Sequence, residues 1–229
     1  MQVFQIRLKL FLLKNIKVEC LQNDLNSFID GGLVKDEELL ELHQANRYKY
    51  YCFDGLYPIE KDKVYKKGII YSLTLRTIDN RLADFFANKL VNEFNDKFKG
   101  LTSEIRIIPK KHIDKIYSVT PVILKNDGYW KNKLSIDDFE RRLFENLIKK
   151  YNYVMNTKID EDFQLYTGIE FKNKKPVAFH YKNIKLLGDK ISLNIAENKI
   201  TQDIIYMSIG TGLGEMNSRG AGFINYRYF

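Results

Sequence analysis

The sequence predicts an α+β protein, and two kinds of periodicity carry this prediction. Residues 4–10 alternate between apolar and polar side chains, which is the period of a half-buried β-strand. Residues 79–94 and 135–151 instead repeat apolar side chains at steps of three and four, as amphipathic helices do. Strand-like and helix-like segments follow in the order β-α-β-β-α-β, and a second pass repeats a similar order. We therefore predict two tandem ferredoxin-like domains, each with helices packed on one face of an antiparallel sheet.

The first domain is predicted over residues 1–119. Apolar positions over 21–42 indicate a helical segment that Gly31 and Gly32 break, and a second helix begins at the capping residue Asp79 and ends at Gly100. The segments expected as strands are rich in aromatic and branched residues, and they comprise 4–10, 50–53, 69–75 and 101–108. We expect residues 113–119 to extend the last of these strands beyond the turn at Pro109.

The second domain is predicted over residues 120–229. Its first helix begins at Ser135 with a capping-box variant, and its second covers 201–208 before the chain enters a glycine-rich loop. Segments with strand character are 121–124, 165–171, 176–181, 190–195 and the aromatic tail 223–229. No low-complexity linker joins the two domains.

Composition favours a nucleic-acid ligand without proving one. The chain has 229 residues and a net charge of +8, and it carries 15 tyrosines, 15 phenylalanines and one tryptophan. Unpaired bases stack on aromatic rings and phosphates bind lysine and arginine, so this combination suits RNA. Lysine-rich composition also occurs in proteins without such a partner, so charge alone leaves the question open.

The cysteines and histidines give no metal-binding pattern. Cys20 and Cys52 lack the spacing of a paired ligand motif, and His43, His112 and His180 lie far apart in sequence. We expect no metal, no cofactor and no disulfide framework, although a metal site assembled from distant segments stays open. Charges interrupt the first apolar residues and no uncharged run reaches membrane-spanning length, so we expect a cytoplasmic protein without a membrane partner.

A dense group of glycines lies near the C-terminal end. Five of the chain's 13 glycines fall within residues 210–222, between an apolar helix-like run and an aromatic strand. Glycine lacks a Cβ, so successive backbone amides can turn toward an anion, and we predict that this loop binds phosphate. The residues expected to bind RNA there are Gly210, Gly212, Gly214, Asn217, Ser218, Arg219, Gly220 and Gly222. The alternative is that the glycines only permit tight packing at a helix-to-strand junction.

Three segments resemble one known family. Residues 212–223 resemble the glycine-rich signature of the CRISPR-associated Cas-six endoribonucleases, members of the RAMP superfamily that cut precursor CRISPR RNA. Residues 42–53 resemble that family's segment in which a histidine follows the first helix, a lysine lies six residues on, and an aromatic strand comes next. Residues 119–121 fall where the family has a step from a small residue to proline between its two domains.

The resemblance implies that His43 and Lys49 are catalytic. It also implies that a basic hairpin with Lys172, Lys174 and Lys175 grips the RNA. The chain departs from the family at two points. Many relatives have a cation where this sequence has Met216, and some have a catalytic tyrosine in the neighbourhood of Phe28. We therefore expect a histidine-lysine pair rather than a triad with tyrosine.

The expected reaction is metal-independent cleavage of CRISPR repeat RNA. The 2′-hydroxyl attacks the adjacent phosphorus, a histidine near neutral pKa moves the protons, and a lysine stabilises the transition state. The resemblance implies 2′,3′-cyclic phosphate and 5′-hydroxyl ends. Other subunits of a CRISPR effector complex, or a second copy in a homodimer, are further partners that stay open.

Two other functions are alternatives. One is a non-catalytic RNA-binding subunit of a CRISPR effector complex, against which the spacing of His43 and Lys49 argues. The other is a ferredoxin-like protein that binds a small molecule, in which the basic charge is only compositional. A steep inverse dependence of RNA binding on salt would argue against the second alternative.

Overall fold

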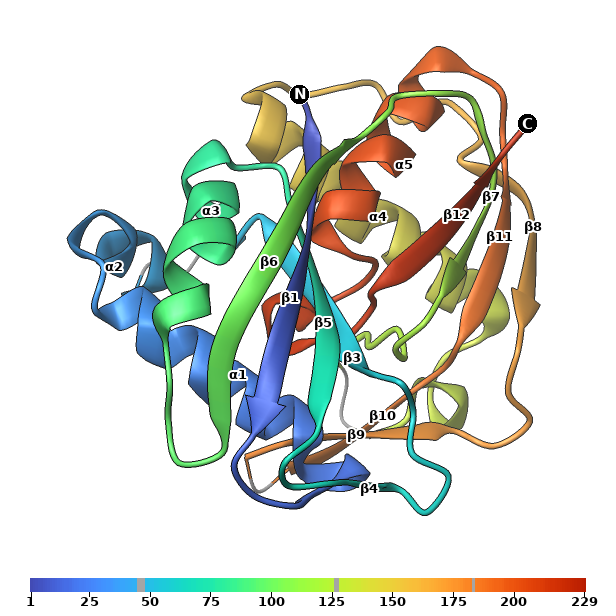
Figure 1. The fold of residues 1–229 in the computed structure, drawn as a ribbon. Helices are drawn as coiled ribbons and strands as arrows, with labels where there is room; N and C mark the ends of the chain where they lie inside the picture. Colours follow the sequence, from blue (N-terminus) through green and yellow to red (C-terminus); the bar gives the residue numbers. More distant parts are fainter. Residues whose placement is uncertain (45–47, 126–127, 183) are drawn as a thin grey trace.

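The computed structural model describes residues 1–44, 48–125, 128–182 and 184–229, and the side chains of 42–44 lie outside this description. Within these ranges the chain builds two four-stranded antiparallel sheets, one from each half, with helices packed against both (Figure 1). Both sheets have the strand order of a ferredoxin-like unit, in which the first strand lies between the third and the fourth. The predicted α+β class is therefore confirmed.

The first sheet has the order β3-β5-β1-β6. Its central strand, β1 (Val3–Leu12), pairs with β5 (Ile70–Thr77) on one side and β6 (Phe98–Ile108) on the other. β3 (Tyr51–Tyr57) forms the outer edge beside β5. The predicted alternation holds along β1, where inward-facing leucines and isoleucines are fully buried. A short two-stranded ribbon of β2 (Ile16–Lys17) and β4 (Val64–Tyr65) lies beside this sheet.

The helices of the first half bury one face of this sheet. They are α1 (Val18–Val34), α2 (Glu37–Gln44) and α3 (Asn80–Asp84), which continues as η1 (Phe85–Lys89) and η2 (Leu90–Asn92). Asp79 caps α3 as predicted, because its side chain accepts hydrogen bonds from the amides of Arg81 and Leu82. These elements pack their apolar faces against the sheet and form the first core.

Two boundaries in the first half differ from the prediction. The helical segment breaks at residues 35–36, and α1 runs through Gly31 and Gly32. A Cβ on Gly32 would lie 3.0 Å from the Phe85 ring, so this glycine allows a close approach. Gly100 does not end a helix: it lies within β6, where a Cβ would lie 2.1 Å from the carbonyl oxygen of Leu90.

The second sheet has the order β12-β7-β11-β8. Its strands are β7 (Ile113–Ser118), β8 (Tyr166–Phe171), β11 (Ile191–Ile195) and β12 (Ile224–Tyr228). Its helices are α4 (Ile136–Met155), which begins with the predicted capping box, and α5 (Lys199–Thr211), and the 3-10 turn η3 (Trp130–Asn132) precedes α4. β9 (Val177–Tyr181) and β10 (Ile184–Gly188) form a separate hairpin.

The expectation that residues 113–119 extend the preceding strand is wrong. β6 ends at Ile108, and β7 instead pairs with β11 and β12 as the first strand of the second sheet. Ile113 and Ile116 belong to the second core, so burial of these two side chains decides the pairing. Residues 121–124, expected as a strand, make only isolated bridges to Asp189 and Glu215. A domain division after residue 119 stays a prediction. β7 precedes that position in the sequence but belongs to the second sheet.

α5 joins the two halves. The Tyr206 hydroxyl on this helix donates a hydrogen bond to the Ile108 carbonyl at 2.6 Å and accepts one from the amide of Val3 at 3.2 Å. Arg76 of β5 is buried and donates to the side chain of Asn225 in β12 at 2.8 Å. These contacts hold α5 and β12 against the first sheet. In the part of the chain that the structure describes, no helix has the length and apolarity needed to cross a membrane.

Candidate functional site

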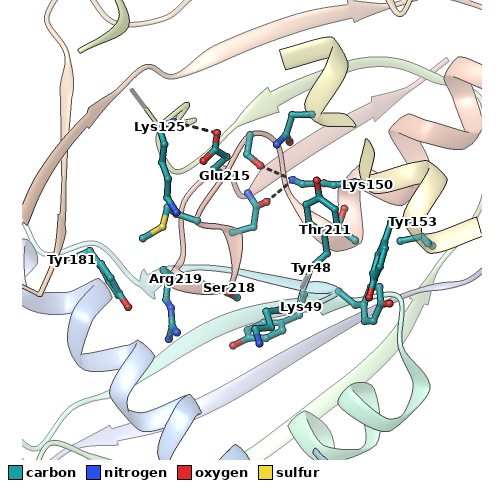
Figure 2. Close-up of a pocket in the computed structure, with 17 residues that line it drawn as sticks. Tyr48, Lys49, Lys125, Lys150, Tyr153, Tyr181, Thr211, Glu215, Ser218 and Arg219 are labelled. Atoms are coloured by element: carbon teal, nitrogen blue, oxygen red, sulfur yellow. Dashed lines mark hydrogen bonds between the residues drawn. The ribbon is translucent and has the colours of Figure 1, made fainter. Parts of the chain in front are cut away.

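A cleft of about 680 Å³ opens where the two halves of the chain meet (Figure 2). Its lining comes from the residues leading into β3, one face of α4 and the glycine-rich loop after α5, together with Lys125 and with Tyr181 of β9. Lysine, arginine and tyrosine side chains predominate in the lining. The lining residues include Tyr48, Lys49, Tyr50, Lys125, Asn146, Lys150, Tyr153, Tyr181, Gly214, Glu215, Asn217, Ser218 and Arg219.

A buried lysine joins α4 to the glycine-rich loop. Lys150 is 3% exposed, and its ammonium group donates to the carbonyl oxygens of Gly212 at 3.0 Å and Gly214 at 2.6 Å. Its third hydrogen bond goes to Oδ1 of Asn217 at 2.5 Å (Figure 2). Three acceptors match the three donors of an ammonium group. The loop therefore turns oxygens inward to surround a cation.

Burial lowers the pKa of Lys150 to about 7, because removal from water disfavours the charged form. The nearby thiol of Cys52 and carboxylate of Glu215 oppose this shift to a smaller extent. The three oxygens around the nitrogen also favour the proton. The net effect is a lowered pKa, so Lys150 titrates near neutral pH.

The glycines of the loop are buried, and the amides of three of them donate hydrogen bonds to backbone carbonyls. Gly210 lies in the last turn of α5, where a Cβ would lie 2.7 Å from Ile78, so its expected place in a phosphate loop is wrong. The amides of Gly212, Gly220 and Gly222 donate to the carbonyls of Ser208, Asn217 and Pro121 at 2.7, 3.0 and 2.8 Å. These contacts favour the packing alternative. RNA binding by these glycines stays a prediction, and Gly214 is the loop glycine that lines the cleft.

Asn217 holds the loop in shape. Its side-chain amide donates to the carbonyls of Leu213 at 2.8 Å and Ala221 at 3.0 Å, while its oxygen accepts from Lys150. Asn217 and Ser218 form the short helical turn η4 (Asn217–Arg219), which borders the cleft. The side chain of Asn217 therefore stabilises the loop itself. A contact of Asn217 or Ser218 with RNA stays a prediction.

Arg219 lines the cleft but already has an acidic partner. Its guanidinium forms an ion pair with Asp30 of α1 and donates to Oδ1 of Asn26 at 2.6 Å. It also lies 5.5 Å from the ring centre of Tyr181 in β9 (Figure 2). The side chain thus ties the loop to α1 and to the β9-β10 hairpin, and Asp30 neutralises part of the charge it offers to a phosphate.

Three tyrosines cluster at the opposite end of the cleft. The rings of Tyr50 and Tyr153 stack with centres 6.0 Å apart and 18° between their planes. Tyr48 meets Tyr153 edge-on at 5.5 Å. Tyr50 has a φ of 60°, a left-handed conformation that is uncommon for a residue with a bulky side chain. Its carbonyl oxygen is fixed by hydrogen bonds from the Thr77 hydroxyl at 2.8 Å and the Ile78 amide at 3.2 Å.

The predicted catalytic pair is only partly covered by the structure. His43 lies in the last turn of α2, and its side chain falls outside the described residues. Residues 45–47, between the pair, also lie outside them. Lys49 is described, and it lines the cleft beside the tyrosines (Figure 2). The roles of both residues stay predictions.

The predicted basic hairpin is a turn of residues 172–175, called the basic turn, and it lies apart from the cleft. Lys172, Lys174 and Lys175 are exposed in the connection from β8 to β9, and Lys172 pairs with Glu170 at 2.5 Å. Asn173 anchors this turn by donating to the fully buried carboxylate of Asp189 at 2.7 Å. The turn is thus a fixed, solvent-facing cationic surface, and its grip on RNA stays a prediction.

Sequence reasoning missed the α4 face of the cleft. Asn146, Lys150 and Tyr153 follow at steps of four and three, so they share one side of the helix. The signal was present, because Lys150 and Asn146 stand among Leu143, Leu147 and other apolar residues of the buried stripe. Polar side chains on such a stripe need buried partners or a ligand.

The acidic, histidine and cysteine side chains that the structure describes form no shared metal site. Within the described ranges, no three of these side chains lie where they could hold a metal ion together. Cys20 is exposed and Cys52 is buried, and both are free thiols.

The fold and the cleft define a class: a protein of two ferredoxin-like units that meet at a basic, tyrosine-lined cleft. Comparison with known families agrees with this description. Residues 104–226 match the family model "CRISPR associated protein Cas6, C-terminal", which is more than half of the chain. The chain therefore belongs to the Cas6 family.

Individual relatives are distant in sequence but alike in fold. The chain is 26% identical over 217 residues to "CRISPR-associated endoribonuclease Cas6 2" of Methanocaldococcus jannaschii, covering 85% of this chain and 87% of the relative. A solved structure named "An RAMP protein binding different RNA substrates" superposes with a TM-score of 0.73 at 20% identity, over 98% of this chain and 99% of that one. Another, "CRISPR associated protein Cas6", gives 0.70 at 21% identity with the same coverage. These likenesses confirm the tandem ferredoxin-like fold.

Proposed function

We propose that this protein is an endoribonuclease that binds CRISPR repeat RNA in the cleft and cleaves it to produce guide RNAs. One observation supports the proposal: the cleft has a cationic, tyrosine-rich lining that includes Lys49, which follows His43 by six residues in the sequence. Family membership and the endoribonuclease name of the Methanocaldococcus jannaschii relative support the same activity. The RNA substrates named for one structural neighbour support the ligand.

The proposed reaction needs only side chains of this chain. His43 takes the proton of a ribose 2′-hydroxyl, whose oxygen forms a bond to the adjacent phosphorus as the bond to the 5′-oxygen breaks. The 5′-oxygen leaves with a proton that the protonated His43 returns or water supplies, which gives a 2′,3′-cyclic phosphate and a 5′-hydroxyl. Lys49 stabilises the extra negative charge on the phosphorus oxygens at the transition state. Metal independence follows from these roles and is part of the proposal.

The two halves of the chain divide the work in this proposal. Residues 1–119 supply the catalytic pair, and residues 120–229 supply the glycine-rich loop and the basic turn. Repeat RNA is the principal partner, and other CRISPR effector subunits or a second copy of the chain are secondary ones. The free thiols fit the reducing cytoplasm, which we propose as the site of action.

Cleavage of the repeat RNA encoded beside the gene, in EDTA, tests the proposal. The wild type is expected to cut once per repeat, and His43→Ala to lose cleavage while keeping RNA affinity within about twofold. His112→Ala serves as the matched control, because this histidine packs on Phe229 at the far end of the second sheet. Equal cutting by His43→Ala would remove the catalytic assignment. Tight binding without cutting by the wild type would favour the non-catalytic subunit.

A further inference from the structure

The end of the cleft opposite Arg219 carries features that cleavage chemistry does not use. Tyr153 lies in the last turn of α4 and is 41% exposed. Phe139 and Tyr151 of the same helix are buried. One side of the Tyr153 ring rests on Tyr50, and Tyr48 meets its edge. Such a partly exposed ring, backed by another ring, is a surface on which a further planar group can stack.

A buried acceptor lies on the same face of α4. Oδ1 of Asn146 is shielded from solvent, and within the described ranges of the chain it accepts no hydrogen bond. An unsatisfied buried acceptor costs stability, so its presence in a cleft points to a donor supplied by a ligand. Asn146 and Tyr153 are seven residues apart, which is about 10 Å along a helix, and both line the cleft.

The backbone at Tyr50 gives a second sign of a built site. A tyrosine with φ of 60° carries conformational strain, and such strain persists where the surrounding structure enforces it. Here two hydrogen bonds to the Tyr50 carbonyl from Thr77 and Ile78 enforce it. The result is that Tyr50 supports the ring of Tyr153 across the junction of the two halves.

We propose that Tyr153 and Asn146 form a binding site for one unpaired base of the RNA, with adenine preferred. The base stacks on Tyr153, and its exocyclic amino group donates to Oδ1 of Asn146 once the amide turns from its shielded position toward the cleft. Asparagine pairs with adenine through N6 and N7, because its amide offers one acceptor and one donor. Bases outside a duplex expose these edges and are commonly stacked on aromatic side chains. This inference rests on the proposed function, since it assumes that RNA enters the cleft.

The site fixes which nucleotide faces Lys49. A base held at the tyrosine end places the chain's phosphates along the lining toward Lys49 and Arg219, which lie between Tyr153 and Tyr181 in the view of Figure 2. Holding one base thus sets the register of the backbone relative to the proposed catalytic pair. The site selects the cleavage position by reading sequence, whereas the cations only attract the backbone.

Binding of fluorescein-labelled RNA octamers, followed by anisotropy, tests the inference. The probes are octaadenylate, octauridylate and an octamer without bases, all with methylated 2′-hydroxyls so that cleavage cannot occur. The wild type is expected to bind octaadenylate about tenfold more tightly than the abasic octamer, the usual effect of one stacked base. Tyr153→Ala should remove most of this difference, and Tyr153→Phe should retain it because the ring does the stacking.

Two further variants separate the parts of the site. Asn146→Ala should abolish the preference for octaadenylate over octauridylate while leaving stacking in place. Tyr117→Ala is the control, because this tyrosine of β7 is equally exposed, at 42%, and lies outside the cleft. Should Tyr153→Ala fail to fold, the abasic octamer and Asn146→Ala still decide the matter.

The inference is overturned if the abasic octamer binds as tightly as octaadenylate, or if Tyr153→Ala behaves as Tyr117→Ala. Continued cleavage of repeat RNA in that case would leave the proposed function intact. Failure of the wild type to bind any octamer and to bind or cleave repeat RNA would instead refute both.

Discussion

Nζ of Lys150 lies 2.5 Å from Oδ1 of Asn217, and this contact joins a helix of the second half to the glycine-rich loop. The loop was expected to present amides to a phosphate. In the structure it presents the carbonyls of Gly212 and Gly214 to the ammonium group of Lys150, and phosphate binding by its amides stays a prediction. The shape of the loop therefore depends on a buried side chain of α4.

Lys150→Met is expected to lower the free energy of unfolding by about 2 kcal/mol at neutral pH, because three oxygens lose their donor. Urea unfolding followed by circular dichroism measures this change. Lys149→Met is the control, since Lys149 is exposed and pairs with Glu145 at 3.5 Å on the same helix. We expect Lys149→Met to change stability by less than about 0.5 kcal/mol. Equal effects of the two substitutions would show that the internal cation does not hold the loop.

The same lysine predicts a dependence of stability on pH. Burial lowers the pKa of Lys150 to about 7 in the folded chain, below its ordinary value of 10.5. Between these values the unfolded chain binds the proton and the folded chain does not, so this group raises stability as pH increases from about 7 to about 10. The cost of Lys150→Met should therefore be larger at pH 9 than at pH 6. A cost that stays constant or falls with pH would contradict the lowered pKa.

Most of the longer strands and helices could be predicted from the sequence because periodicity is a local property, whereas β2, β4 and β10 were not predicted. The alternation of residues 4–10 and the capping residue Asp79 both depend on near neighbours, and both predictions are confirmed. The pairing of β7 is different. Its strand character was visible, but its sheet depends on where Ile113 and Ile116 are buried, which is a matter of contacts far away in sequence.

The candidate site also had features that could be predicted from the sequence and features that depend on distant contacts. The glycine density located the loop, and the position of Lys49 beside the cleft was expected from a resemblance. The partner of the loop could not be deduced, because Lys150 lies about 60 residues before the oxygens it binds. The acidic partner of Arg219 is nearly 200 residues away in sequence, on α1, so its partial neutralisation was also hidden.

Gly222→Ala tests whether the loop glycines serve packing. Gly222 has a φ of 65°, and a Cβ there would lie 1.9 Å from the carbonyl oxygen of Leu213. Strain and overlap together should lower the unfolding free energy by about 3 kcal/mol. Gly31→Ala is the control, because that glycine lies in α1 with nothing within 4 Å of an added Cβ, and alanine there should add up to about 1 kcal/mol. Thermal unfolding of both variants should shift in opposite directions.

The ion pair between Asp30 and Arg219 gives the last prediction, which concerns RNA affinity. Asp30→Asn removes the carboxylate that partly neutralises Arg219, while the hydrogen bond from Arg219 to Asn26 stays available. The arginine then offers its full charge to a phosphate. RNA affinity at low salt should rise, and the slope of log affinity against log salt should steepen by up to about 0.7, the value for one phosphate of a single strand.

Arg219→Gln should have the opposite effect on the slope, because it removes that cation. Asp114→Asn is the matched control: Asp114 pairs with Arg227 of β12, and neither residue lines the cleft. It frees one arginine and changes net charge equally, so a general attraction between protein and RNA would give both asparagine variants the same slope. A steeper slope for Asp30→Asn alone would show that the phosphate chain passes beside Arg219. Identical slopes would mean that the RNA follows another path across the protein.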